Sequence, residues 1–472
     1  MWYPRRKQKR IREPPLLPLT PWDDLSLAQL FEGVLAMGAT GSGKSSTLLH
    51  LMLALMRLGV GMLFLTSKRD DYDTIARMAK LAKRESALVR FSTDGPYRFD
   101  FLNYELAAPG GNLITAGQLM QDLVDISTRT SSQNSSEPFW MIAACRKIRM
   151  AMTLVYRATG QCSVEDLYRC STSMPNTQDQ RDSPEFRETD CYLALNAAVH
   201  KYPDDYEVGL AVDYVLHEWP RMSDRTAGSI DAHVINVLEK LMSGSVRELI
   251  ASGATNCSPA LLDDGKLIVI DTPILTHREP GQLVQAAWKL STQRHALRRE
   301  SKRPIAIYAD EAQCHAIPSV DSMVQAVARS HKLINISITQ NIPLLESVLK
   351  RREDVLAWIS NLQTKFIFAN SDKDTNEYFS SMFGQSKQLM GGTSTRPGQV
   401  DPLQDWFGGQ RQDANYSLNE NWLPDVRPEE FSRLRKGGHE NNCVVDFYCF
   451  QGGRRFSNGK TWIKTSFMQM TE

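Results

Sequence analysis

The sequence predicts an α/β protein in which helices cover a mostly parallel sheet and one all-helical domain interrupts this core. Short apolar strands alternate with helical stretches in two separate regions of the 472-residue chain. Strands that are apolar along their whole length are typical of parallel sheets covered on both faces. Between the two regions the pattern is helical, without a convincing strand. The expected strands are residues 33–38, 61–66, 87–92, 266–271, 305–310, 334–339, 364–369 and 443–450.

The same patterns divide the chain into four parts. Residues 1–30 are expected to form a basic, proline-rich N-terminal arm, and residues 31–126 the first part of the α/β core. Residues 127–256 are expected to form the inserted all-α domain. Residues 257–472 then complete the core. Within this last part, residues 386–425 are rich in Gly, Ser, Pro and Gln, which predicts a long surface loop.

Composition excludes several classes of protein. Apolar residues make up 42% and charged residues 23% of the chain, as in ordinary soluble globular proteins. No segment reaches the roughly 18 uninterrupted apolar residues that a membrane span needs. The eight cysteines show no CxxC pair, so reduced thiols are expected in place of disulfides or a zinc site.

The formal net charge is only +1, but residues 1–12 carry six Lys or Arg and no acid. This arm is either a solvated tail or a binding segment for DNA or lipid headgroups.

The segment "GATGSGKS" predicts a nucleotide-binding site. It fits the pattern G-x-x-x-x-G-K-[ST], follows an expected strand and opens an expected helix, as a phosphate-binding loop requires. Glycines let backbone N–H groups turn toward phosphate oxygens, and the helix N-terminus adds its positive dipole end. In such a loop Lys44 reaches the β- and γ-phosphates, and the Ser45 hydroxyl binds Mg²⁺. The expected nucleotide-binding residues are Gly38, Ala39, Thr40, Gly41, Ser42, Gly43, Lys44, Ser45 and Ser46.

Two adjacent acids, Asp310 and Glu311, lie at the carboxyl end of the expected apolar strand 305–310. Neighbouring carboxylates repel each other unless a cation or a ligand lies between them. We expect Asp310 to hold Mg²⁺ and Glu311 to act as the general base that activates water. Gln340, at the tip of the next strand, would sense the γ-phosphate or position the water. The alternative for Asp310 and Glu311 is an exposed acid pair at a strand end. The alternative for Gln340 is a polar residue that simply ends its strand.

The motifs also decide between P-loop families. No LSGGQ-like signature precedes Asp310 and no N-K-x-D follows it, which argues against an ABC transporter subunit and a GTPase. The sequence resembles the FtsK–HerA clade of hexameric RecA-like motors, and more closely the coupling ATPases of conjugative type IV secretion systems (TraG/TraD type). The segments that carry this resemblance are "GATGSGKS", "ADEAQ", "SITQN", "LTSKRDDYD", "YRFDFLNYE", "EPFWMIAACRKI", "NLQTKFIFANSDKDTNEYFSSMFG" and "VRPEEFSRLRKG".

The resemblance implies a RecA-like core, ATP and Mg²⁺ as cofactors, and an ATP hydrolase that forms a homo-oligomeric, hexameric ring. It also implies that an arginine between the acid pair and Gln340 reaches into the ATP site of the neighbouring subunit. Arg329 fits this role, and Lys332 fits it less well because an ammonium clamps phosphate less rigidly than a guanidinium. The alternative for Arg329 is an ordinary surface ion pair. The segment "LTSKRDDYD" lacks the family's Pro-Gly turn, so no interface role is carried over to Lys68.

The leading hypothesis is a DNA-dependent ATPase that moves DNA, with relaxase or secretion-channel proteins as further partners. The transmembrane pair usual in the family is absent, so a cytoplasmic protein is expected. It could also lie at the inner face of the cell membrane, held there by a separate membrane anchor. The alternatives are a soluble HerA-like helicase, a viral genome-packaging motor and a protein-translocating ATPase. A nucleotide-gated scaffold without turnover is disfavoured because Glu311 is present.

Overall fold

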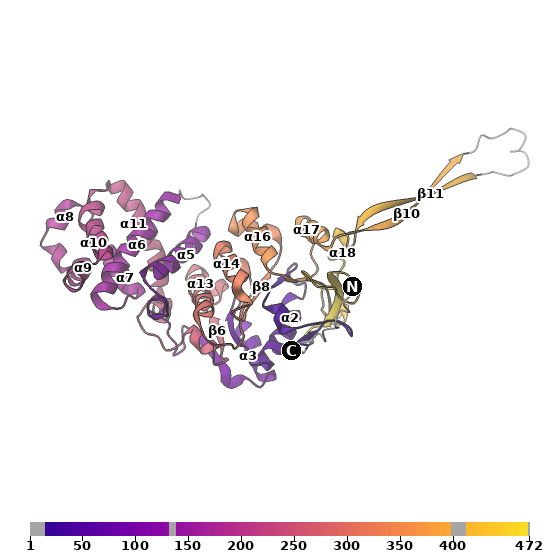
Figure 1. The fold of residues 1–472 in the computed structure, drawn as a ribbon, viewed down its shortest axis with the longest axis horizontal. Helices are drawn as coiled ribbons and strands as arrows, with labels where there is room; N and C mark the ends of the chain where they lie inside the picture. The colour runs from indigo at the N-terminus through magenta and orange to yellow at the C-terminus, as the bar shows by residue number, and fades with distance from the viewer. Residues whose placement is uncertain (1–14, 132–137, 398–411, 471–472) are drawn as a thin grey trace, which may run out of the picture.

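The computed structural model of the chain describes residues 15–131, 138–397 and 412–470. Three regions follow one another along its longest axis: a helical region, an α/β body and a projecting hairpin (Figure 1). A nine-stranded sheet forms the centre of the body, in the order β13-β12-β9-β3-β8-β7-β4-β6-β5. Its strands are β3 Val34–Met37, β4 Gly61–Leu65, β5 Leu88–Ser92, β6 Leu267–Asp271, β7 Ile305–Ala309, β8 Leu333–Thr339, β9 Thr364–Ile367, β12 Val444–Gln451 and β13 Trp462–Met468.

The sheet is parallel from β9 to β5, and only β12 and β13 are antiparallel to their neighbours. The predicted α/β class with a mostly parallel sheet is therefore confirmed. Each of the eight expected strands corresponds to a strand of this sheet. The edge strand β13 was not predicted, because its segment alternates between buried and exposed side chains and is not apolar throughout.

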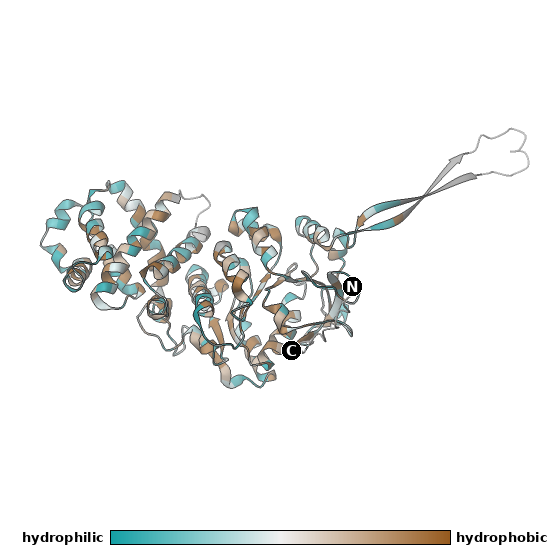
Figure 2. Ribbon diagram, viewed as in Figure 1, coloured by the Kyte–Doolittle hydropathy of each residue, from teal (hydrophilic) through white to brown (hydrophobic). Residues whose placement is uncertain are grey.

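Helices cover both faces of the sheet. Successive strand residues point to opposite faces, so neighbouring side chains of one strand pack against different helices. Leu63 and Leu65 belong to one apolar cluster, while Met62 and Phe64 belong to the other. The first cluster includes residues of α13 Ile274–Arg298, α14 Pro318–Ala328, α15 Ile342–Leu349 and α16 Arg352–Asn361. The second includes residues of α2 Lys44–Arg57 and α3 Asp71–Leu81. Figure 2 shows the hydrophobic residues gathered in the sheet and on the inner sides of these helices.

The chain between β5 and β6 folds into helices, and the described part of it contains no strand. The long helix α6 contacts most of the others in this region. Helix α5 spans Leu113–Ser131 and so runs across the boundary expected at residue 127. It contacts both α6 of the helical region and α13 of the body. The helices are α4 Phe101–Ala107, α5 Leu113–Ser131, α6 Pro138–Thr159, α7 Val164–Thr172, α8 Gln178–Asp182, α9 Asp190–Lys201, α10 Tyr206–Asp213, α11 Asp224–Leu241 and α12 Gly244–Ile250.

The surface loop expected over residues 386–425 is largely a β-hairpin. Strand β10 Gln385–Pro397 pairs antiparallel with β11 Gln412–Pro424 along its whole length. The loop prediction is therefore wrong for these strands, while residues 398–411 lie outside the described residues. Gly and Pro, two of the residue types abundant in this segment, are uncommon in strands, so its composition favoured a loop. The hairpin leaves the body between α17 Lys373–Phe383 and α18 Pro428–Ser432 and projects away from it (Figure 1).

The expected N-terminal arm is partly packed onto the body. Leu17, Leu19 and Leu25 are buried, and residues 17–18 pair with residues 24–25. The apolar side chains of "LLPLT" explain this packing, which the proline content obscured. Residues 1–12, with the basic cluster, lie outside the described residues. Among the helices that the structure describes, none is both long and apolar enough to cross a membrane.

Candidate nucleotide-binding site

The loop between β3 and α2 has the glycines that a phosphate-binding turn requires. Gly41 and Gly43 have φ angles of +73° and +84°, which side-chain-bearing residues rarely adopt. A Cβ atom at Gly43 would also lie 2.5 Å from Val445, and one at Gly38 would lie 2.6 Å from Phe368. Around Gly41, in contrast, a Cβ would meet nothing within 4 Å. The loop is thus closely packed at Gly38 and Gly43 and open at Gly41.

The start of α2 offers free donors to an anion. Gly43 is the N-cap residue and has no side chain that could bond the first N–H groups of the helix. Lys44 donates from Nζ to the carbonyl oxygens of Gly38 at 2.6 Å and Ala39 at 3.0 Å. Burial lowers the pKa of Lys44, and the charges of Asp310 and Glu311 partly oppose this shift. The site therefore combines an ammonium, a loop of backbone donors and a helix N-terminus. This combination fits the phosphates of a nucleoside triphosphate.

Asp310 follows β7 and faces the start of α2. The Ser45 hydroxyl donates to its Oδ2 at 3.4 Å, and the backbone N–H of Glu311 donates to Oδ1 at 3.0 Å. Burial raises the pKa of Asp310 to about 6, and the nearby Asp71 and Glu311 carboxylates add to this effect. No cluster of three His, Cys, Asp or Glu residues suited to a metal occurs in the described ranges. The Ser45 hydroxyl and the Asp310 carboxylate are adjacent oxygen donors, and such a pair fits Mg²⁺, which keeps water and phosphate oxygens among its ligands.

Glu311 lies in the left-handed region of backbone conformation, with φ 51° and ψ 52°. Few residues other than glycine adopt this conformation, and it is common at functional sites. Its carboxylate accepts hydrogen bonds from two glutamines: Gln340 Nε2 at 3.4 Å on Oε1 and Gln313 Nε2 at 2.5 Å on Oε2. Gln340 also accepts a hydrogen bond from Thr40 of the phosphate-binding loop at 3.2 Å. Gln340 therefore connects that loop with Glu311.

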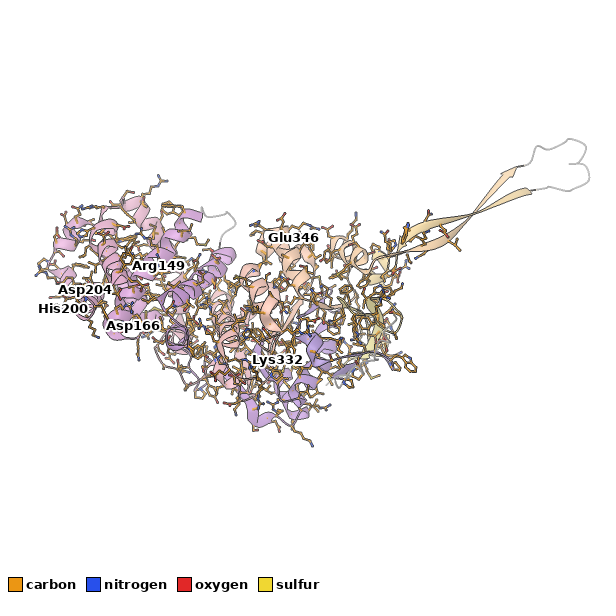
Figure 3. All side chains as sticks on the ribbon, in the orientation of Figure 1. Arg149, Asp166, His200, Asp204, Lys332 and Glu346 are labelled. Carbon is orange, nitrogen blue, oxygen red and sulfur yellow. The ribbon has the colours of Figure 1, made fainter. Side chains whose placement is uncertain are left out.

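The structure does not bring Arg329 to the site of its own chain. Arg329 follows α14, is 71% exposed and pairs with Glu32 at 3.4 Å. Glu32 precedes β3, whereas the phosphate-binding loop follows β3, so the two lie at opposite ends of this strand. Lys332, labelled in Figure 3, precedes β8 at the same end and lies over the ring of Phe31, 5.1 Å from its centre.

Sequence reasoning missed two residues of the site, Gln313 and Asp71. Asp71 accepts hydrogen bonds from the backbone N–H groups of Ser67 and Lys68, both at 2.8 Å. The segment from Ser67 to Asp71 follows β4, which pairs with β7, so it lies beside Asp310. Burial raises the pKa of Asp71 as well. The acids in "SKRDD" were visible in the sequence, but the pairing of β4 with β7 was not.

Because folding raises the pKa of Asp310, Asp310→Asn should stabilise the nucleotide-free protein. Well below pH 4, the carboxyl is protonated in both the folded and the unfolded chain. Between about pH 4 and 6 only the unfolded chain ionises, so folding stability falls as the pH rises, and above pH 6 the full penalty applies. We expect the variant to be about 1–3 kcal/mol more stable at pH 7.5, since one pKa unit corresponds to about 1.4 kcal/mol.

Denaturant unfolding of both proteins at pH 4.5 and 7.5, without Mg²⁺, measures this difference. The stability advantage of Asp310→Asn over the wild type should be smaller at pH 4.5 than at pH 7.5. An Asn variant that is no more stable than the wild type at pH 7.5 would contradict the assignment of a strained, buried charge.

A phosphate-binding loop between a parallel strand and a helix, with an acid pair at the end of a nearby strand, defines a RecA-like P-loop protein. Comparison with solved structures identifies the particular fold as that of a conjugative coupling protein. The unbound form of TrwBdeltaN70 matches with a TM-score of 0.64 and 13% identity over 98% of this chain and 90% of that one. TrwB bound to the ATP analogue ADPNP matches with 0.64 and 13% over the same shares, and TrwB with ADP and Mg²⁺ with 0.62 and 15% over 98% and 91%.

Sequence comparison gives a second result. The family model described as "TraM recognition site of TraD and TraG" matches residues 304–435, which include β7, β8, Arg329, Gln340 and the hairpin. No curated protein sequence matches the chain. The resemblance to coupling proteins that the motifs predicted is thus confirmed by the fold and by this part of the sequence.

Proposed function

We propose that the chain is an ATP hydrolase that assembles into a ring and couples ATP hydrolysis to DNA translocation in conjugative transfer. The main support is that the proposed residues Lys44, Glu311 and Gln340 lie together in a fold that is that of a coupling protein. The central observation is the path from Thr40 through Gln340 to Glu311, because it joins the phosphate-binding loop to the proposed base. The solved TrwB structures contain an ATP analogue, or ADP with Mg²⁺, which supports ATP and Mg²⁺ as the cofactors here.

In this proposal each residue of the site has a distinct task. Residues 38–46 hold the triphosphate, and Lys44 exchanges its two loop carbonyl partners for phosphate oxygens. Ser45 and Asp310 hold Mg²⁺, which would neutralise phosphate charge. Glu311 accepts the proton of the attacking water, and Gln340 orients that water or reports the presence of the γ-phosphate.

Arg329 is proposed to act on the neighbouring subunit. Its position at the opposite end of β3 prevents it from serving its own site, and its exposure leaves it available to another copy. An exposed ion pair such as Arg329–Glu32 contributes little stability, so exchanging it for a phosphate is easy. A contact between two different surfaces of identical subunits closes into a ring when the rotation allows it. We therefore propose a homo-oligomeric ring, as a hexamer.

The partners and the division of the chain are also proposals. DNA is the proposed substrate, with relaxase or secretion-channel proteins and a separate membrane anchor as further partners. The printed name of the family model supports a contact for a partner protein within residues 304–435. We propose that residues 127–256 form a functional unit that receives the DNA–protein substrate on the cytoplasmic side.

ATP hydrolysis measured with and without DNA tests this proposal. We expect DNA to stimulate turnover, and the stimulation to fall steeply between low and physiological salt because DNA binding releases counterions. Single-stranded and double-stranded DNA are compared separately, with Glu311→Gln as the inactive control. Stimulation by unfolded polypeptide and not by DNA would instead support a protein-translocating ATPase.

A further inference from the structure

Gln313 lies in a short 3-10 turn, Ala312–Cys314, directly after Glu311. Its side chain is buried, with 6% exposed, although it carries a polar amide. The amide Nε2 donates to Oε2 of Glu311 at 2.5 Å. A buried amide is normally present because its donors and acceptors have partners. Here the partner of the donor is the carboxylate that we propose as the base.

The other end of the Gln313 amide is held as well. Thr339, the buried last residue of β8, donates its hydroxyl to Gln313 Oε1 at 2.9 Å. The Glu311 carboxylate can only accept, so Nε2 of the amide must face it, and Oε1 accepts from the Thr339 hydroxyl. Thr339 is also paired with Met37, the last residue of β3 before the phosphate-binding loop. The chain of contacts therefore starts from the strand that carries this loop.

The turn that carries Gln313 is anchored to α13. The backbone N–H of Cys314 donates to the Glu311 carbonyl at 2.9 Å, and Gln282 donates to the Cys314 carbonyl at 2.5 Å. Lys289 donates to the carbonyl of the next residue, His315, at 2.9 Å. A strained conformation such as that of Glu311 persists only where its surroundings fix it. These bonds supply that fixation for the backbone, and Gln313 supplies it for the side chain.

We propose that Gln313 is a positioning residue that holds the Glu311 carboxylate for proton transfer; this inference rests on the proposed function. The geometry also assigns the two oxygens. Oε2 accepts the short bond from Gln313, whereas the bond that the described residues make to Oε1 is the longer one from Gln340, at 3.4 Å. Oε1 is therefore the oxygen that accepts the proton of the attacking water. Gln340 contacts the phosphate-binding loop, so the position of its side chain can change when a nucleotide binds. The side chain of Gln313 is buried and keeps its position.

The test is Gln313→Met, which keeps the length of the side chain and removes the donor. Misplacing a catalytic group by about 1 Å can lower a rate roughly 100-fold, so we expect kcat to fall about 10- to 100-fold. The KM for ATP and the affinity for a fluorescent ATP analogue should stay within about twofold of the wild type, because Gln313 has no part in holding phosphate. Thr339→Val should lower kcat in the same direction but less.

A double-mutant comparison separates the loss of Glu311 positioning from a non-specific structural effect of the substitution. In the Glu311→Gln background, Gln313→Met should cause no further loss of residual turnover, because residues that act as a unit are not additive. Gln325→Met is the matched control: Gln325 is also buried, donates to the Phe31 carbonyl at 3.1 Å and accepts from Asn335 at 2.8 Å, and Phe31 precedes β3 whereas the phosphate-binding loop follows it. It should retain near-wild-type kcat.

Each outcome bears on one claim. Wild-type kcat in Gln313→Met, or an equal loss in Gln325→Met, would overturn the positioning role. If Gln313→Met does not fold, Thr339→Val decides, and unchanged kcat in that variant overturns the proposal. Wild-type turnover in Glu311→Gln would instead overturn the proposed base itself, whatever Gln313→Met does.

Discussion

Lys44→Ala is expected to abolish ATP turnover. In the proposed site the lysine is the main cationic contact to the β- and γ-phosphates, and in the nucleotide-free structure it donates to the carbonyls of Gly38 and Ala39. Without it the loop keeps its backbone donors but loses the charge that offsets the triphosphate. Steady-state hydrolysis should fall to background with and without DNA, and the affinity for ATP should fall as well.

Glu311→Gln provides the contrasting control for this prediction. The amide cannot accept the proton of the attacking water, but it leaves the phosphate contacts in place. This variant should bind ATP with near-wild-type affinity and hydrolyse it only at a small residual rate. Wild-type hydrolysis in Lys44→Ala would contradict the assignment of the phosphate-binding loop.

Arg329→Ala is expected to keep ATP binding and to lose DNA-stimulated hydrolysis. Lys44 and Mg²⁺ already stabilise the bound nucleotide, so an arginine from a neighbour matters mainly as charge develops in the transition state. Such an inserted arginine is typically worth roughly 10³–10⁵ in rate. Arg351→Ala is a suitable control, since Arg351 is also 71% exposed and forms an ion pair with the nearby Asp354 at 3.7 Å. It should hydrolyse ATP like the wild type.

Mixing two inactive variants distinguishes action on a neighbour from action within one chain. Lys44→Ala subunits retain Arg329, and Arg329→Ala subunits retain a sound phosphate-binding loop. Mixed rings should therefore regain part of the activity, at interfaces where the intact arginine meets the intact loop. If rings shown to be mixed have no activity, Arg329 does not act across the subunit interface.

The parallel part of the fold could be predicted because its strands are buried on both faces. Segments such as "GMLFLT" and "KLIVID" are apolar without interruption, and both became central strands of the sheet, β4 and β6. β13 and the hairpin lack this signal. The strand β13 has one exposed edge and alternating side chains, and the hairpin strands have the composition of a loop.

The site could be predicted where a motif fixes local geometry. The loop before α2 and the acids after β7 were found from sequence, and the structure places Thr40, Gln340 and Glu311 in one connected group. Gln313 and Asp71 could not be found in this way, because their contacts depend on which strands are neighbours in the sheet. The place of Arg329, far from its own loop, came only from the structure.

The most direct test of the account is whether ATP hydrolysis moves DNA through the protein. The measurement is the displacement of streptavidin from end-biotinylated DNA by the purified protein with ATP and Mg²⁺, on single-stranded and on double-stranded substrates. The account predicts displacement that depends on ATP and is lost in Glu311→Gln, although that variant still binds ATP. Hydrolysis that DNA stimulates but that displaces streptavidin from neither substrate would contradict a DNA-translocating motor.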